Sequence, residues 1–294
     1  MNAQDTSSPP LGQIVPSETE LGAIATILHD AAGIVIAPGK TSMVQSRLAK
    51  RLRALHLPDY ASYIALVRSD AGTDERREMV SALTTNVTHF FREKHHFDTL
   101  RDAALPPLLA RARAGGRVRI WSAGSSNGQE AYTIAMVLAE LCPDFERFDI
   151  RILASDIDPT MIARGRAGRY PATAVEPIPA ELQRKYFTPC DGDFEVIAPL
   201  RKLVSFKELN LHKSWPMSGK FDIIFCRNVV IYFDPPAQAK LWLRFEAQLA
   251  PDGWLFLGHS ERITARPDSQ LTSAGVTTYR LPDTGPKSGG PAWP

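Results

Sequence analysis

The stretch Val118–Glu130, VRIWSAGSSNGQE, decides the fold that the sequence predicts. Its apolar first half suits a buried strand, a loop of glycine, serine and asparagine follows, and residues 131–141 show the apolar period of a helix. The first turn of a helix carries unpaired N–H groups, and Gly124 and Gly128 let a ligand approach the backbone closely. This order predicts a crevice for a nucleotide-like ligand in an α/β sheet, although loops of this composition also occur as plain turns.

The composition of the 294 residues is that of a globular protein, with 44% hydrophobic and 22% charged residues. The net charge of +2 is too small to indicate nucleic acid as the main partner. No apolar run approaches the roughly 20 residues that span a bilayer, and the N-terminus lacks the features of a signal peptide. Three distant cysteines, Cys142, Cys190 and Cys226, argue against a disulfide framework or a cysteine zinc site and fit a reducing cytoplasm.

The pattern along the chain divides it into two domains and two tails. Residues 1–17 are polar and rich in proline, and residues 283–294 are rich in glycine and proline, so both are expected to be disordered. Residues 18–115 show apolar stripes at helical spacing and no clear strand, which predicts a helical N-terminal domain. We expect a hinge at Gly115-Gly116 and a second domain over residues 116–282.

The second domain alternates strand and helix, which predicts βαβ units and a parallel, Rossmann-like sheet. The rhythm breaks over about 168–203, where five prolines and short strand-like runs predict an inserted subdomain with a small antiparallel sheet. The expected strands are 118–122, 150–154, 203–206, 221–226, 254–257 and 275–281, with helices at 130–141 and 236–249.

Two carboxylates indicate which ligand the crevice holds. The sequence contains neither the GxGxxG fingerprint of a dinucleotide site nor the GxxxxGK[ST] of a P-loop. Asp156, after the second strand, is placed to accept hydrogen bonds from ribose hydroxyls, and Glu130 is able to pair with an ammonium group. A ligand with a ribose and an amino acid but no phosphate fits, and S-adenosylmethionine is the obvious candidate. Taken alone, Glu130 is better explained as an ordinary helix-start carboxylate that the helix dipole stabilises.

A basic segment lies in the helical domain. No acidic residue occurs between Ala31 and Pro58. In the same segment Arg47, Lys50 and Arg51 share one helix face, and Arg53 lies close by. The simple interpretation is a solvated face, and the alternative is a docking surface for an acidic partner.

Three histidines, His89, His95 and His96, raise the question of a metal site. The spacing shows no carboxylate or cysteine at an obvious ligand position, so no metal is expected. The nearby phenylalanines Phe90 and Phe97 are expected to anchor the segment in a core.

Five segments in the same order resemble the chemotaxis receptor methyltransferases of the CheR family. The resemblance runs from about residue 21 to residue 281 and implies a Rossmann-like S-adenosylmethionine domain, with a small β-subdomain, behind a helical domain. It implies methyl transfer to receptor glutamates, giving methyl esters and the product S-adenosylhomocysteine. The segments are Thr84–Phe97 (TTNVTHFFREKHHF), Trp121–Ala135 (WSAGSSNGQEAYTIA), Ala154–Pro159 (ASDIDP), Phe221–Asp234 (FDIIFCRNVVIYFD) and Leu249–Glu261 (LAPDGWLFLGHSE).

The resemblance also implies site residues. Arg92 and Tyr232 are the expected catalytic residues: Arg92 orients the acceptor carboxylate and Tyr232 shapes the methyl end of the pocket, although Tyr232 also suits a core position. Ser260 and Glu261 are assigned to the scaffold. The expected cofactor contacts are Asn86, Thr88, Arg92, Glu130, Asp156, Asn210, Leu211, Arg227 and Asn228.

The expected partner is the acidic cytoplasmic helical bundle of a chemoreceptor, with Arg47, Lys50, Arg51 and Arg53 as the docking residues. We expect a cytoplasmic monomer that is recruited to receptor arrays without membrane insertion. Some family members grip a receptor C-terminal peptide with the β-subdomain. The short turn at residues 188–194 has a single glycine and does not favour that tether.

Two rival functions are kept, and a third is disfavoured. The first is a non-catalytic sensor or scaffold that binds S-adenosylmethionine, which the full set of expected site residues disfavours. The second is a methyltransferase of another signalling protein or of a small molecule. The third, a nicotinamide oxidoreductase, lacks its fingerprint.

Overall fold

The computed structural model describes residues 15–37, 39–263 and 269–283, and it divides into two compact units. One comprises Met1–Thr85 with Tyr232–Asp234, and the other comprises Asn86–Ile231 with Pro235–Pro294. The division therefore falls between residues 85 and 86, instead of at the expected hinge near residue 115. The reason is that residues 94–113 pack into the core of the second unit. Most of the expected tails, 1–17 and 283–294, lie outside the described residues.

The first unit is helical, as the apolar stripes predict. Ser17 and Glu20 form a capping box at its first helix, which ends at left-handed Gly33. Among the described residues no helix is long and apolar enough to cross a bilayer. The helices of this unit are α1 (Glu18–Ala32), α2 (Thr41–Ala54), α3 (Tyr60–Arg68), the short η1 (Asp70–Gly72) and α4 (Thr73–Leu83).

The second unit is built on a seven-stranded sheet of order β6-β2-β1-β7-β8-β10-β9. The pairs among β6, β2, β1, β7 and β8 are parallel, and β10 is antiparallel to both β8 and β9. The strands are β1 (Val118–Ala123), β2 (Ile150–Asp156), β6 (Val204–Glu208), β7 (Phe221–Cys226), β8 (Leu249–Leu257), β9 (Thr272–Gly275) and β10 (Thr278–Arg280).

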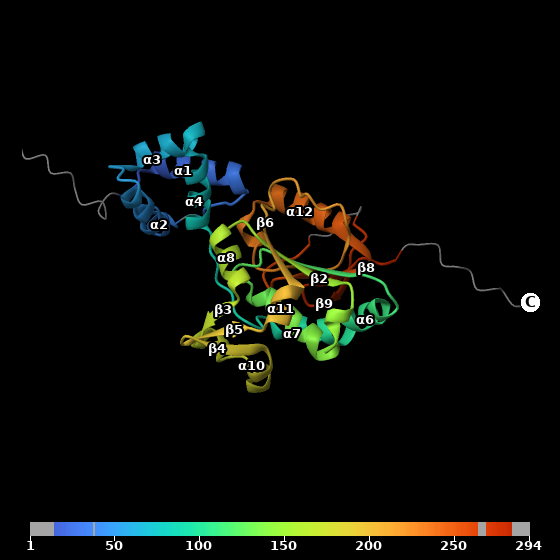
Figure 1. Cartoon of the computed structure of the whole chain (residues 1–294). Helices are drawn as coiled ribbons and strands as arrows, with labels where there is room; N and C mark the ends of the chain where they lie inside the picture. Colours follow the sequence, from blue (N-terminus) through green and yellow to red (C-terminus); the bar gives the residue numbers. More distant parts are fainter. Residues whose placement is uncertain (1–14, 38, 264–268, 284–294) are drawn as a thin grey trace, which may run out of the picture. The chain divides into compact units, whose positions relative to one another are not determined.

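Helices cover both faces of this sheet (Figure 1). On one face Ile120 of β1 joins the core that includes Leu105 and Leu109, while on the other Trp121 packs against Phe245, with ring centroids 5.4 Å apart. The alternation of neighbouring residues between faces is that of a strand buried on both sides. The helices are α5 (Lys94–Thr99), the π-helical turn η2 (Leu100–Ala104), α6 (Leu105–Arg113), α7 (Gln129–Leu141), η3 (Phe145–Arg147), α8 (Pro159–Ala167), η4 (Val230–Tyr232) and α12 (Pro235–Gln248).

The insertion is a three-stranded antiparallel sheet of order β3-β5-β4, which confirms the predicted subdomain. Phe90 packs edge-on against Tyr170 and Phe187, so the insertion is anchored to the segment before α5. Its elements are β3 (Arg169–Pro171), α9 (Ala172–Val175), α10 (Ala180–Tyr186), β4 (Phe187–Cys190), β5 (Asp193–Val196) and α11 (Ala198–Leu203).

The end of the sheet differs from the expected single strand 275–281. Thr277 adopts a left-handed φ of 46°, which turns the chain between β9 and β10. The expected strand is therefore a hairpin, whose outer strand β9 begins at Thr272.

Candidate functional site

The loop between β1 and α7 lies against the end of β2. The N–H groups of Gly124 and Ser125 both donate to the carbonyl of Ser155, at 2.8 and 2.9 Å. Gly124 has a φ of 75°, and a Cβ there would lie 2.3 Å from Cγ2 of Val229 in the loop after β7. Glycine is required at 124 for both reasons, and its absence of a side chain brings the two loops together.

Asp156 ends β2 beside this loop, and its side chain is buried. Its carboxylate accepts hydrogen bonds from the backbone N–H groups of Ser126 (2.7 Å) and Asp158 (2.9 Å). Burial outweighs these hydrogen bonds and raises the pKa of Asp156 to about 6. A buried carboxylate at the carboxyl end of a parallel strand, beside a helix-start loop, suits recognition of a ribose.

Asn86 brings the segment before α5 to the same place. Its side-chain amide donates to Asp158 (2.8 Å), and its carbonyl accepts from the hydroxyl of Ser126 (2.9 Å). Residues 30 to 72 positions apart along the chain therefore meet here. Thr88, two residues on, is half-buried.

Three charged side chains form a buried set that we call the Arg227 network: Glu93, Glu130 and Arg227. The side chain of Arg227 is 2% exposed, and its guanidinium lies 3.1 Å from Oε2 of Glu130 and 3.3 Å from Oε2 of Glu93. Ser122 also donates to Glu130 at 2.7 Å. Burial is the largest influence on both acids, and it raises the pKa of Glu130, whereas Arg227 and His259 lower the pKa of Glu93.

Glu130 contacts Ser122 and Arg227, and burial is the largest cause of its raised pKa. The negative charge of this carboxylate would stabilise a cation bound beside it. Sequence reasoning included Arg227 and Glu130 and missed Glu93, although Glu93 stands directly after Arg92 in the recognised motif.

Glu261 holds the loop that carries Arg227 and Asn228. Its carboxylate accepts hydrogen bonds from the N–H groups of residues 228, 229, 230, 231 and 258, at 2.6–3.3 Å. Asn228 has a left-handed φ of 59°, a strained conformation that this set of bonds stabilises. These contacts agree with a scaffold role for Glu261.

The two expected catalytic residues lie in different units. Arg92 is half-buried in the second unit and donates from Nη1 to the carbonyl of Val87 at 3.0 Å. Tyr232 is half-buried and belongs to the first unit, where its carbonyl accepts from Val35 at 2.8 Å. Tyr232 is therefore not among the residues that the second unit brings together.

Asn210 and Leu211 follow β6 at the edge of the sheet. The preceding residue, Leu209, donates its N–H to the carbonyl of Asp156 at 2.9 Å, which ties this loop to the end of β2. Leu211 is buried, and its carbonyl accepts from Arg244 at 2.6 Å. The backbone after β6 therefore lies beside the end of β2, and a cofactor role for Asn210 and Leu211 stays a prediction.

The basic segment of α2 does not present all its charges to solvent. Arg51 forms a two-pronged ion pair with the buried Glu75 of α4, at 3.0 and 2.5 Å, and Tyr63 donates to the same carboxylate. Arg47 donates to the carbonyl of Thr84 at 2.6 Å. Both arginines thus hold the helices of the first unit together, because α4 supplies acceptors that the local sequence pattern does not reveal. Lys50 and Arg53 are exposed.

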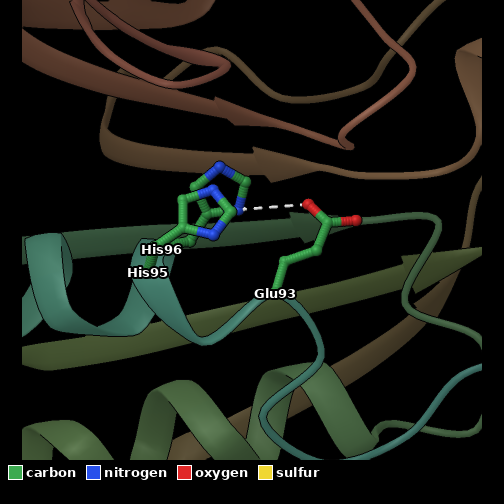
Figure 2. Close-up of side chains that lie close together, drawn as sticks. All are labelled: Glu93, His95 and His96. Carbon is green, nitrogen blue, oxygen red and sulfur yellow. Dashed lines mark ion pairs between the residues drawn. The ribbon is translucent and has the colours of Figure 1, made fainter.

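Glu93, His95 and His96 form what we call the histidine cluster, shown in Figure 2. One potential ligand atom from each lies within 4.8 Å of the others, and Nδ1 of His96 faces Oε2 of Glu93 at 3.5 Å. The spacing of the histidines did not reveal the carboxylate of Glu93. It lies beside His96 because the chain turns at Glu93, which has a left-handed φ of 56°.

The charges around the histidine cluster do not favour a metal ion. The oxygen of Glu93 that a cation would bind already lies 3.3 Å from the guanidinium of Arg227, which would repel it. Nε2 of His96 is within hydrogen-bond distance of the carbonyl of Val276 (3.2 Å) and the hydroxyl of Thr277 (3.0 Å), and burial lowers the pKa of His96 to about 4. A neutral His96 that fastens α5 to the β9–β10 hairpin accounts for these contacts.

Two family models match consecutive parts of the chain. Residues 19–84 match the CheR methyltransferase all-alpha domain, and residues 86–279 match the CheR methyltransferase SAM binding domain. The change from one model to the other falls at the division between the two structural units.

Curated relatives match over nearly their whole length. The chain is 48% identical to a probable chemotaxis protein methyltransferase of Rhizobium etli, over 86% of this chain and 96% of the relative. It is 42% identical to chemotaxis protein methyltransferase 2 of Pseudomonas aeruginosa, over 86% and 89%. It is 38% identical to the chemotaxis protein methyltransferase of Escherichia coli, over 94% and 99%.

Proposed function

This chain belongs to the CheR methyltransferase family, and from that premise we propose that it methylates glutamate side chains of chemotaxis receptors and forms methyl esters. The coarser activity follows from the family: it is a methyltransferase of chemotaxis that uses S-adenosylmethionine to methylate chemoreceptors during sensory adaptation. The glutamate acceptor and the roles of individual residues are the finer part of the proposal.

The placement of Asp156 and Glu130 at one edge of the sheet carries the proposal. Asp156 ends β2, and Glu130 lies in the first turn of α7 after β1; because β1 and β2 are neighbouring parallel strands, both residues stand at the same edge of the sheet. We assign Asp156 to the ribose hydroxyls and the largely buried carboxylate of Glu130 to the ammonium of the methionine moiety. Asn86, Thr88, Asn210, Leu211, Arg227 and Asn228 complete the proposed cofactor site.

The reaction needs little chemistry from the protein. An ordinary glutamate has a pKa of about 4.3, so its carboxylate is ionised at neutral pH and needs no general base. A carboxylate oxygen attacks the sulfonium methyl, the new C–O bond forms as the C–S bond breaks, and the electron pair stays on sulfur. S-adenosylhomocysteine and a glutamate methyl ester result. The task of the site is to hold oxygen, carbon and sulfur in line.

Arg92 is our candidate for orienting the acceptor carboxylate. It is half-buried, and the bond from Nη1 to Val87 fixes its guanidinium. Charge on both reactants disappears as the methyl moves, so a tight ground-state ion pair with Arg92 would raise the barrier. Its role is therefore positional, whereas the proposed role of Tyr232 near the transferred methyl rests on the family resemblance alone.

The proposed docking surface is the exposed part of α2. Lys50 and Arg53 remain available to meet acidic receptor helices, whereas Arg47 and Arg51 are held within the first unit. We propose that the protein acts in the cytoplasm as a monomer, at receptor arrays. In the β-subdomain, Asp191 and Gly192 both have positive φ and form a tight two-residue turn between β4 and β5, which supports the proposal that this subdomain does not bind a receptor peptide.

The test is to incubate the protein with methyl-labelled S-adenosylmethionine and membranes that contain chemoreceptors. We expect label on the receptors that alkali releases, because esters hydrolyse in base. Alkali-stable label would indicate N-methylation, and label on a different protein would indicate another signalling substrate. Cofactor binding without any transfer would indicate a sensor or scaffold and would overturn the proposal.

A further inference from the structure

We propose that Glu93 is a positioning residue that acts through Arg227 on both Arg92 and Glu130. The proposal deepens the function proposed above and rests on it for the roles of Arg92 and Glu130. Glu93 itself touches neither the proposed cofactor pocket nor the acceptor in the assignment made above.

Glu93 lies where three segments meet. Its carboxylate is 3.3 Å from Arg227 after β7, 3.2 Å from Nδ1 of His259 after β8, and 3.5 Å from His96 in α5. Its backbone has a left-handed φ of 56°, which costs free energy for a residue with a side chain and persists only where the surroundings hold it. Glu93 is thus a strained, largely buried acid in contact with Arg227, His259 and the neutral His96, and these contacts join the three segments.

Arg227 transmits this restraint. Its Nη1 faces Glu130, while Nη2 faces Glu93 and also donates to the backbone carbonyl of Arg92. The guanidinium carbon lies 5.4 Å from the centre of the Phe97 ring, so the group is held on a further side. One guanidinium therefore ties the backbone of the proposed catalytic arginine to the proposed ammonium contact.

The charges explain what Glu93 contributes to cofactor binding. The Arg227 network contains two carboxylates and one guanidinium, the adjoining His96 is neutral, and His259 contacts Glu93 from an exposed position, so the network itself carries one excess negative charge when both acids are ionised. S-adenosylmethionine brings an ammonium and a sulfonium. If the charge of Glu93 is removed, Glu130 is left to neutralise Arg227 alone, and the attraction for the ammonium disappears.

The decisive variant is Glu93→Gln, which keeps the size and backbone of the side chain and removes its charge. The binding of two probes is measured by calorimetry: S-adenosylmethionine, and methylthioadenosine, which has the ribose and adenine without the amino acid. We expect the Kd of S-adenosylmethionine to rise roughly tenfold to hundredfold, as for loss of a hydrogen bond to a charged group. The Kd of methylthioadenosine should stay within about twofold of the wild-type value, because Glu130 does not contact it.

Asp222→Asn is the matched control. Asp222 is a buried carboxylate at the opposite end of β7, paired with Arg111 at 2.5 Å and with the N–H of Arg119 at 2.8 Å. Its loss removes a similar buried charge and should destabilise the fold without changing either Kd. This comparison separates positioning from general loss of structure.

A wild-type Kd for S-adenosylmethionine in Glu93→Gln would overturn the inference, as would an equal loss of affinity for both probes. A raised Kd for S-adenosylmethionine alone supports it. These binding measurements need no methyl acceptor. A wild-type protein that fails to methylate glutamate would therefore contradict the proposed function and leave the role of Glu93 to be judged separately.

Discussion

Replacing Glu261 with glutamine tests whether one buried carboxylate holds the loop after β7. Oε1 of Glu261 accepts from the N–H groups of Val229, Val230 and Ile231, and Oε2 accepts from those of Asn228 and Gly258. A glutamine amide has one oxygen and one NH₂ group. Whichever way the amide is oriented, at least two N–H groups then face another donor and lose their acceptor.

The expected cost follows from these lost bonds. A hydrogen bond to a charged group contributes about 1.5–3 kcal/mol, so the loss of two gives about 3–6 kcal/mol. The side chain is buried, so water does not replace the lost partners. A domain has a total free energy of unfolding of roughly 5–15 kcal/mol, and this single atom change therefore removes a large part of it.

The assay is urea unfolding of Glu261→Gln followed by calorimetry with S-adenosylmethionine. We expect a lower unfolding midpoint and weaker cofactor binding, because Arg227 and Asn228 lie on the loop that Glu261 fixes. Ser260→Ala, at the exposed neighbouring position, is the control and should change neither property. A loss of less than about 1 kcal/mol in Glu261→Gln, with unchanged binding, would refute the reasoning.

Three further outcomes are expected. Affinity for S-adenosylmethionine should fall about tenfold from pH 7 to pH 5, because burial raises the pKa of Asp156 to about 6 and its carboxylate gains a proton as the pH falls. The protonated group no longer accepts from ribose, and the same pH dependence in Asp156→Asn would contradict this explanation. Arg51→Ala should destabilise the first unit by about 2–4 kcal/mol in thermal unfolding, because Glu75 is left buried without its ion-pair partner. The double variant Lys50→Glu with Arg53→Glu should preserve stability and raise only the KM for receptor. Equal effects of the two sets would argue against separate structural and docking roles for these residues. Dialysis against a chelator should leave turnover unchanged, and recovery of lost turnover by added zinc would show that the histidine cluster binds metal.

The features visible in the sequence were those set by local pattern. Strand and helix periodicity predicted the parallel sheet and the inserted antiparallel sheet, and the positions of Glu130 and Asp156 after successive strands predicted a common crevice. This works because parallel strands must present their carboxyl ends at one edge. For Asn86, only the family resemblance predicted a place in the cofactor site, since nothing in its local pattern indicates a contact with Asp158.

The features that the sequence hid depend on contacts between distant segments. Arg51 belongs to a regular basic face on α2, and only the packing of α4 against α2 reveals its pairing with Glu75. Likewise, Glu93 looks like an ordinary acid after Arg92 until the chain reversal places it beside Arg227. Helical residues 94–113 resembled an extension of the first domain, because a helix that packs on a sheet has the same apolar period as one that packs on helices.

The most direct test of the proposed reaction is the site of methylation on the acceptor. The purified protein is incubated with S-adenosylmethionine and the cytoplasmic fragment of a chemoreceptor, and the receptor peptides are then mapped by mass spectrometry before and after mild alkali. We predict methyl groups on glutamate side chains, lost on alkali treatment and absent when those glutamates are replaced by alanine. Methyl groups on lysine, arginine or histidine would contradict the proposal. Unmethylated receptors, together with methylation of another kind of acceptor, would also contradict it.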